Sequence, residues 1–461
     1  MKASQFNIAI PHYGSTLLFN TLTMALAEFR PEEYCRIESL SSNSRCDDCG
    51  KEEWIKELWG QGFIIDDDFS EIEYLRNKFE KAKQDSETLA MVICPTLECN
   101  FSCLYCYECH CPAEMNQETE ESIIRFIDQH VQQYKRLDVT WFGGEPLLNF
   151  PTIERLSFLL MEICRKNNVK YSAILITNGF LLEKPIRDKL SSLCIKGVQF
   201  SIDGPAEIHD KRRFLKDGQP TFYKVFNNFV DFVNLTEGIS VGLRINVDKR
   251  NLNRVGDLEP LFDLINSRIL PDKIKNTLLN VCFGLVTPTN NKPDSRGNNY
   301  YSYEEFLRLI LAVQHKYNNK YFFILKPQLG ILPGRMIPCG VIKENVFIVD
   351  GKGDLYKCLD HCGMKSEVVG NIIPRGSVNE RISQWDNYSP FENTDCVECK
   401  ILPLCMGGCP KKNMEMKRGK KNASCLPQLN QIRDQIEQLY QHYKMSPQRQ
   451  ETNAPLPDCP L

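Results

Sequence analysis

The stretch Glu98–Glu108, which reads ECNFSCLYCYE, follows the apolar run LAMVICP and spaces its cysteines as CxxxCxxC. A [4Fe–4S] cluster normally takes a thiolate on each of its four irons. Thiolates from Cys99, Cys103 and Cys106 alone would leave one iron free to bind another ligand. The alternative is a zinc knuckle or a set of buried thiols, but structural zinc sites use paired CxxC spacing, which this stretch lacks.

The triplet resembles the signature of the radical S-adenosylmethionine (SAM) superfamily, including the aromatic Tyr105 just before the last cysteine. The resemblance implies that the free iron chelates the amino and carboxylate groups of SAM, and it places Tyr105 among the cofactor-binding residues.

Composition limits the classes of function that fit the chain. Its 461 residues are 42% hydrophobic and 25% charged, which predicts a globular protein of about three domains. A net charge of −3 with no basic stripe predicts no nucleic-acid partner. No signal peptide or long apolar run is present, so we expect no membrane insertion. The 21 cysteines then indicate metal ligation in a reducing cytoplasm rather than disulfides.

Residues 1–85 are predicted to form a separate domain. Tyr13 and Gly14 form a hairpin turn between two strands, helices are expected near 20–30 and 52–59, and a short apolar strand ends the unit. This order resembles a winged-helix peptide-recognition module; the alternative is a domain that caps its neighbour. Cys46 and Cys49 form a CxxC that we interpret as a surface thiol pair or a weak metal site.

Residues 88–320 alternate between strand and helix patterns, which predicts an α/β fold with a parallel sheet covered by helices. The expected strands are 89–94, 137–143, 171–177, 197–202, 239–247 and 277–286, and the clearest helices are 121–134, 222–235 and 304–317. Six strands are similar to the partial (β/α)6 TIM-type barrel of radical SAM enzymes, in which chemistry gathers at the carboxyl ends of the strands. The cysteine triplet follows the first strand.

Two turns after later strands carry further candidate cofactor residues. WFGGEPLL resembles the GGE motif of the superfamily, which implies that Gly143, Gly144 and Glu145 bind the methionine amino group of SAM. SIDGPAEIHDKRR resembles a segment of anaerobic sulfatase-maturing enzymes and related peptide maturases, which implies that Ser201 and Arg213 hold the SAM carboxylate. These are candidate cofactor-binding residues, and no catalytic residue is assigned.

Each of these turns also has a structural interpretation. Arg212 and Arg213 would otherwise be a solvated charge pair at a helix edge, and Asn178-Gly179 would be a simple turn.

Residues 335–426 carry a second set of cysteines, and residues 427–461 form a predicted helix (428–443) and a Pro- and Gln-rich tail. The spacing resembles the SPASM extension of radical SAM enzymes, which holds two auxiliary [4Fe–4S] clusters and brings the total to three. The resemblance implies these ligands: Cys396, Cys399, Cys405 and Cys425 for one auxiliary cluster, and Cys339, Cys358 and Cys409 for the other.

The chain departs from the sulfatase-maturing pattern at two positions. The pattern has a further cysteine six residues after Cys339, and here that position is Asn345. Either the set of Cys339, Cys358 and Cys409 therefore keeps an open iron, or Cys362 completes it. The catalytic aspartate expected directly after Cys358 is replaced by Leu359, with Asp360 one place later.

These resemblances imply a radical SAM oxidoreductase acting through a 5′-deoxyadenosyl radical. The first choice is a maturase that forms thioether cross-links in a ribosomally synthesised precursor peptide, with a flavodoxin or ferredoxin as reductant. The alternatives are an anaerobic sulfatase-maturing enzyme that forms formylglycine and a non-catalytic iron–sulfur electron carrier.

Overall fold

The computed structural model describes residues 1–41, 52–84, 87–270, 272–273, 279–287, 299–317, 320–321, 324–325, 336–373, 377–417 and 432–445. The chain divides into two compact units. Unit 1 comprises Met1–Gln84, Leu329–Gly340 and Asn387–Leu461, and unit 2 comprises Asp85–Gln328 and Val341–Asp386. Among the helices of these stretches, none has the length and apolar character needed to cross a membrane.

Unit 2 is built on an 11-stranded sheet with the order β12-β11-β10-β9-β8-β7-β6-β13-β14-β15-β16. The first eight strands in this order pair in parallel. Their bounds are β6 Thr88–Ile93, β7 Arg136–Trp141, β8 Lys170–Ile176, β9 Ile195–Ser201, β10 Ser240–Val247, β11 Leu279–Leu285, β12 Ile324–Leu325 and β13 Val346–Val349. The six predicted strands correspond to β6–β11, and each lies within two residues of its predicted limits.

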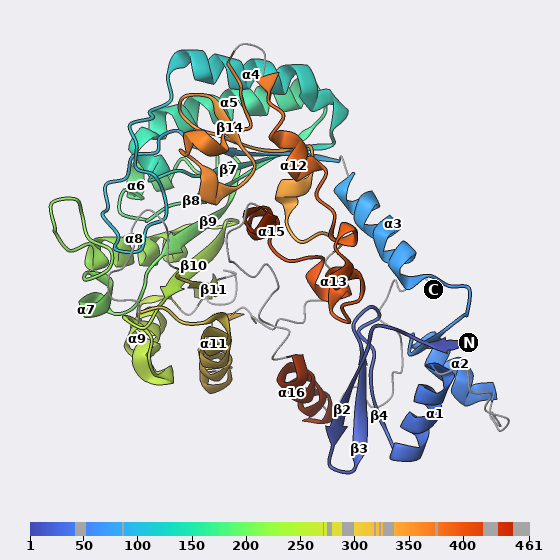
Figure 1. The fold of residues 1–461 in the computed structure, drawn as a ribbon. Coiled ribbons are helices and arrows are strands. Elements are labelled where there is room, and N and C mark those ends of the chain that lie inside the picture. Colours follow the sequence, from blue (N-terminus) through green and yellow to red (C-terminus); the bar gives the residue numbers. More distant parts are fainter. Residues whose placement is uncertain are drawn as a thin grey trace. The chain divides into compact units, whose positions relative to one another are not determined.

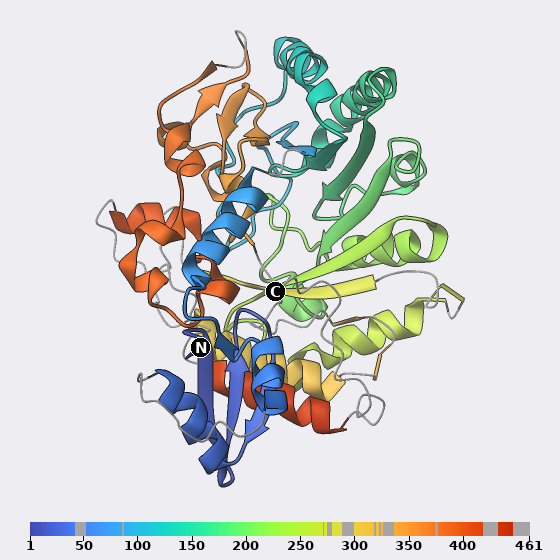
Figure 2. The same ribbon diagram turned by 90° about the vertical axis from the view of Figure 1, so that its right-hand side faces the viewer.

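Helices cover the outer face of this curved sheet (Figures 1 and 2). Their bounds are α4 Gln117–His130, α5 Phe150–Lys166, α6 Lys184–Arg187, α7 Ala206–His209, α8 Phe222–Leu235, α9 Glu259–Arg268 and α11 Tyr303–Tyr317. The aromatic stripe of α8 explains its docking, because Phe200 of β9 meets Phe229 and Phe232 edge-on, with ring centroids 5.4 and 5.6 Å apart.

Side chains alternate between the two faces of a strand, so the neighbours of Phe200 point away from α8. In β10, the alternate residues Leu243 and Ile245 are buried, whereas Arg244 and Asn246 are only partly buried. The inner face of the sheet is therefore partly open and carries polar groups on β9 and β10.

The sheet continues beyond the core strands. β13 pairs in parallel with β6, and β14 Asp354–Tyr356, β15 Gly370–Asn371 and β16 Ser377–Val378 add to it antiparallel. The short helix α12 Ile382–Asp386 ends this part of unit 2. The compact units thus group residues 341–386 with the core and 387–461 with the N-terminal residues. The predicted domain of residues 335–426 instead takes its limits from the first and last cysteines of the later set.

Unit 1 contains a three-stranded antiparallel sheet of β2 Asn7–His12, β3 Ser15–Asn20 and β4 Leu26–Phe29. The predicted hairpin turn is confirmed: Tyr13 and Gly14 have φ values of 40° and 87°, and His12 pairs with Ser15. The helix expected near 20–30 is wrong. This segment ends in a strand because Leu26–Phe29 pairs with β3, and the helix begins only at Pro31, which suits a first helical position.

The remaining described elements of unit 1 are two strands of two residues each and helices of 4 to 14 residues. They are β1 Lys2–Ala3, α1 Pro31–Ser41, α2 Glu52–Gly60, β5 Ile64–Ile65, α3 Glu71–Lys83, α13 Thr394–Val397, α14 Leu402–Cys405, α15 Pro410–Lys417 and α16 Ile432–Met445. The helix α2 confirms the expected helix at 52–59. The helix α16 confirms the one expected at 428–443 from Ile432 onward, and residues 428–431 lie outside the described residues. Cys46, Cys49, Cys425 and the tail after 445 lie outside the described residues.

Candidate active site

The cysteine triplet lies in the loop between β6 and α4. Cys99 and Cys103 are buried, with 6% and 7% of their surface exposed, and Cys106 is half-buried. The loop is held against the segment after α7, since the Ser102 amide donates to the Phe214 carbonyl at 2.8 Å and the Leu104 amide donates to the Arg212 carbonyl at 3.0 Å. Its shape is therefore set by main-chain contacts.

Whether this loop suits an iron–sulfur cluster depends on its donor atoms. No group of three His, Cys, Asp or Glu side chains in the described ranges converges closely enough to hold a metal ion. The chemistry nevertheless fits, because three thiols share one loop and the Phe101 amide donates to Cys99 Sγ at 3.4 Å. Burial and the charge of Glu145 raise the pKa of Cys99, so binding iron would displace a proton from this thiol.

Two buried donors, one in the loop and one beside it, are suited to a ligand with acceptor atoms. Asn100 Nδ2 and Arg213 Nε are buried without a hydrogen-bond partner in the described part of the chain. Buried polar groups are almost always paired, and each exception needs an explanation. A carboxylate oxygen of a ligand would satisfy a buried donor of this kind.

The GGE turn packs directly on the main chain that leads into the triplet. A Cβ atom on Gly143 would lie 2.2 Å from the Thr96 carbonyl oxygen, and one on Gly144 would lie 2.3 Å from the Glu98 carbonyl oxygen. Gly143 also has a φ of 120°, which side chains rarely allow. In this structure the glycines are required because the two loops touch.

Glu145 is completely buried and its carboxylate connects the ends of two strands. It accepts hydrogen bonds from Thr177 Oγ1 and the Asn178 amide, both at 2.7 Å, and from the Leu147 amide at 3.1 Å. Burial raises the pKa of Glu145 to about 6 against the effect of these bonds. Asn178 then donates to Asn100 Oδ1 at 2.8 Å, so the turn after β8 is tied to the cysteine loop.

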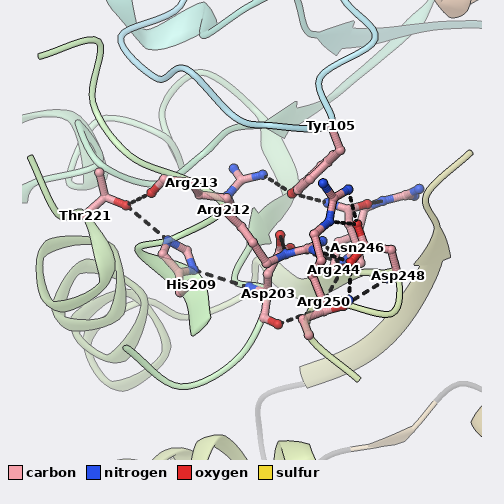
Figure 3. Close-up of polar contacts among 11 residues, drawn as sticks. Tyr105, Asp203, His209, Arg212, Arg213, Thr221, Arg244, Asn246, Asp248 and Arg250 are labelled. Atoms are coloured by element: carbon pink, nitrogen blue, oxygen red, sulfur yellow. Dashed lines mark hydrogen bonds and ion pairs between the residues drawn. The ribbon is translucent and has the colours of Figure 1, made fainter. Parts of the chain in front are cut away.

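Tyr105 lies in a second polar group, shown in Figure 3. Its hydroxyl accepts from Arg213 Nη1 at 2.8 Å and from Asn246 Nδ2 at 3.1 Å. The Arg213 guanidinium also lies 5.6 Å from the centre of the Phe101 ring. Burial raises the pKa of Tyr105 well above its usual range, so the hydroxyl stays neutral. The structure therefore brings together two predicted cofactor residues, Tyr105 and Arg213.

A buried ion network lies beneath Tyr105 (Figure 3). Arg212 donates from Nε to Asp203 at 3.1 Å and from Nη1 to Asp248 at 2.5 Å, and its guanidinium lies 4.8 Å from the centre of the Tyr105 ring. Arg250 pairs with the other oxygen of Asp248. The interpretation of Arg212 and Arg213 as a solvated pair is wrong, because only 2% and 7% of their surface is exposed.

Sequence reasoning missed most of this network. Asp203 and Asp248 each come just after the end of a strand, β9 or β10, and an acidic residue at the carboxyl end of a parallel strand was the available signal. His209 was missed as well; its Nδ1 accepts from the Asp203 amide at 3.3 Å and its Nε2 contacts Thr221 Oγ1 at 3.1 Å. Ser201, in contrast, was predicted and is the last residue of β9, where it is half-buried.

The later cysteines fall in both units. Unit 1 holds the half-buried Cys396, Cys399, Cys405 and Cys409 and the exposed Cys339, whereas unit 2 holds the half-buried Cys358. Between Cys405 and Cys409 the backbone takes three successive positive φ values, 47°, 82° and 73° at Met406, Gly407 and Gly408. Two glycines make this turn possible. The division of these cysteines between two clusters stays a prediction.

Cys362 points into the core of unit 2. Its sulfur lies 3.8 Å from that of Cys94, and both belong to a buried apolar cluster against which Leu359 packs. Asn345 is buried too, and its Nδ2 donates to the Thr88 carbonyl at 2.6 Å. The position without the expected cysteine is therefore occupied by a residue that anchors β6.

Comparisons with known proteins identify a family and several relatives of this chain. Residues 93–249 match the family model of the radical SAM superfamily. A serine-type anaerobic sulfatase-maturating enzyme of Bacteroides thetaiotaomicron is 26% identical over 380 residues, which cover 75% of this chain and 86% of that protein. A cysteine-type enzyme of the same name from Clostridium perfringens is 26% identical over 361 residues, covering 70% and 88%.

Among solved structures, native anSMEcpe with bound AdoMet and Cp18Cys peptide is similar with a TM-score of 0.57 and 20% identity. The match covers 77% of this chain and 98% of that one. This likeness confirms the α/β fold with its parallel sheet. The six-unit barrel, the winged-helix domain and the SPASM domain stay predictions.

Proposed function

The chain carries a radical SAM domain, and from this premise we propose that it modifies a ribosomally synthesised peptide by closing thioether bonds between cysteine sulfur and carbon. The observation that carries the proposal is the loop of Cys99, Cys103 and Cys106, with two unsatisfied buried donors beside it. Bound SAM and the cluster would supply a carbon-centred radical that removes a hydrogen atom from the peptide.

The residues around the loop would hold the cofactor and shape its site. Cys99, Cys103 and Cys106 would ligate the cluster, and Gly143 and Gly144 would keep the loop in place. Ser201 and Arg213 are proposed for the SAM carboxylate, and the unpaired Nε of Arg213 is available for that contact. Glu145 already accepts three hydrogen bonds, which makes positioning of the turn its main role.

We further propose that the later cysteines hold two auxiliary clusters and that Cys362 is not a ligand. Its contact with Cys94 in an apolar cluster supports this assignment. The set of Cys339, Cys358 and Cys409 would then have an open iron, to which a thiolate of the peptide substrate would bind. A flavodoxin or ferredoxin in a reducing cytoplasm is the proposed reductant.

Formylglycine formation is the second candidate. Both curated relatives described above are sulfatase-maturating enzymes, and this chain matches them over most of their length. Against it stands Leu359, which packs in the apolar cluster at the position where the sulfatase-maturing pattern has an aspartate. Asp360 is exposed one residue later.

The products separate the two candidates. The reconstituted protein would be produced without oxygen, supplied with SAM and dithionite, and incubated with a cysteine-rich peptide encoded beside its gene or with a sulfatase peptide. A thioether maturase removes hydrogen from the first peptide and makes its thiols unreactive toward iodoacetamide. A sulfatase-maturating enzyme gives the second peptide an aldehyde that reacts with hydroxylamine. Absence of 5′-deoxyadenosine under both conditions would contradict either enzyme.

A further inference from the structure

The inner face of the sheet carries an arginine that the predicted site leaves out. Arg244 of β10 is half-buried, and its Nε donates to Asn246 Oδ1 at 2.9 Å. A guanidinium has five N–H donors, and the other four of Arg244 make no hydrogen bond to a residue in the described ranges. No ion pair within those ranges neutralises it either, in contrast to Arg212 and Arg250.

The guanidinium is nevertheless held in one place. A Cβ atom on Gly284 of β11 would lie 2.4 Å from Arg244 Nη2 and 2.8 Å from Cζ. The absence of a side chain at Gly284 therefore lets the guanidinium lie directly against β11. The Asn246 side chain, on the same face of β10, accepts from the Arg244 Nε and fixes it (Figure 3). A positioned arginine loses less entropy on binding than a mobile one.

Ser201 stands beside this arginine. The register of the parallel pair β9–β10 places Ser201 opposite Arg244, so their main chains are about 4.8 Å apart and their side chains share one face. The Ser201 hydroxyl, like the free N–H groups of Arg244, makes no hydrogen bond to a described side chain. Arg213 differs, since it is buried and already donates to Tyr105.

We propose that Arg244 and Ser201 form a carboxylate-binding site on the inner face of the sheet, an inference that rests on the proposed function. A guanidinium bonds both oxygens of a carboxylate with parallel N–H groups, and a serine hydroxyl adds a third donor. If the carboxylate is that of the methionine part of SAM, Arg244 joins Ser201 in the role proposed above for Arg213. If it is that of an acidic residue or the C-terminus of the peptide, Ser201 serves the peptide, and Arg213 alone is left for SAM. Arg244 is then a specificity residue for one of these ligands.

Equilibrium binding to the reconstituted, oxygen-free protein tests the site and separates the two sources. The first arm compares the dissociation constants of SAM and decarboxylated SAM. The second arm compares, with SAM present, a blocked glycine-rich pentapeptide carrying a central glutamate with its glutamine counterpart. In each arm, the preference for the carboxylate is the ratio of the two dissociation constants. We expect Arg244→Met to reduce this ratio about tenfold in one arm, since a charged hydrogen bond is lost. The arm that changes identifies the source.

Matched variants control for folding. Arg244→Lys should keep part of the preference, and Arg254→Met should keep all of it, because the Arg254 side chain is 87% exposed and pairs only with Asp257 within the described chain. Gly284→Ala displaces the guanidinium without removing its charge and should also weaken the preference. Iron content measured in parallel shows whether each variant is folded and loaded.

Unchanged preferences in both arms for Arg244→Met would overturn the inference and leave the proposed function intact. If the loaded wild-type protein bound no SAM at all, the proposed function itself would fail. The two failures are therefore distinguishable.

Discussion

Replacement of Arg212 by methionine tests how strongly the buried ion network holds the site together. Methionine keeps much of the volume but removes the charge, so Asp203 loses its only ion pair among the described residues and Asp248 keeps Arg250. Removing one partner of a buried ion pair costs about 3–5 kcal/mol. Of the two carboxylates, only Asp203 loses its last ion pair in the described chain, so we expect the free energy of local unfolding to fall by the lower figure, about 3 kcal/mol.

Hydrogen exchange measured by mass spectrometry reports this loss locally. Peptides that cover residues 202–213 should exchange faster by the factor that corresponds to about 3 kcal/mol, roughly a hundredfold. The double variant Arg212→Met with Asp203→Asn removes both charges and should recover most of the protection, since a neutral pair needs no compensation. Protection in the single variant that stays within about 1 kcal/mol of wild type would refute the assigned role of the network.

Other consequences are testable in the same preparation. Burial lowers the pKa of His209 to about 3, so below pH 6.5 the unfolded chain binds a proton that the folded chain does not. The free energy of unfolding should therefore fall by up to about 1.4 kcal/mol per pH unit from pH 6.5 towards 3. In urea titrations at several pH values, His209→Gln should flatten this slope. Gly144→Ala places a Cβ 2.3 Å from the Glu98 carbonyl, and iron analysis should show loss of the cluster of the triplet while the auxiliary clusters remain. Cys362→Ser should keep the wild-type iron content and Cys358→Ser should lower it, whereas equal losses would make Cys362 a ligand.

Much of the fold follows from short-range pattern. The helix predicted at 222–235 agrees with α8 at both ends, because its aromatic stripe is long and strongly amphipathic. The segment near 20–30 failed because pairing with β3 outweighs local helical preference in a short segment. A pattern within one segment carries no information about the strand that lies beside it.

The candidate site, like the fold, could be predicted from the sequence only in part. The cysteine triplet and the GGE turn could be predicted as candidates because each motif is encoded in adjacent residues. Burial of Arg212 was not foreseeable, since its partners Asp203 and Asp248 lie nine and 36 residues away and meet it only at the ends of two parallel strands. Arg244 was missed for a related reason: it lies inside a strand, and only the register with Ser201 shows what stands beside it.

The ion network also explains how Tyr105 is fixed, because two buried arginines contact its ring and its hydroxyl. Asp203 is completely buried, which opposes ionisation, but Arg212 and Arg213 outweigh this effect and lower the pKa of Asp203. The negative charge is thus retained in the interior and holds Arg212 under the Tyr105 ring, while Arg213 and Asn246 bind the hydroxyl. Two segments far apart in sequence, residues 203–213 and 246–250, therefore meet at one aromatic residue of the cysteine loop. A substitution in either segment should shift the cysteine loop even though it leaves the cysteines themselves unchanged.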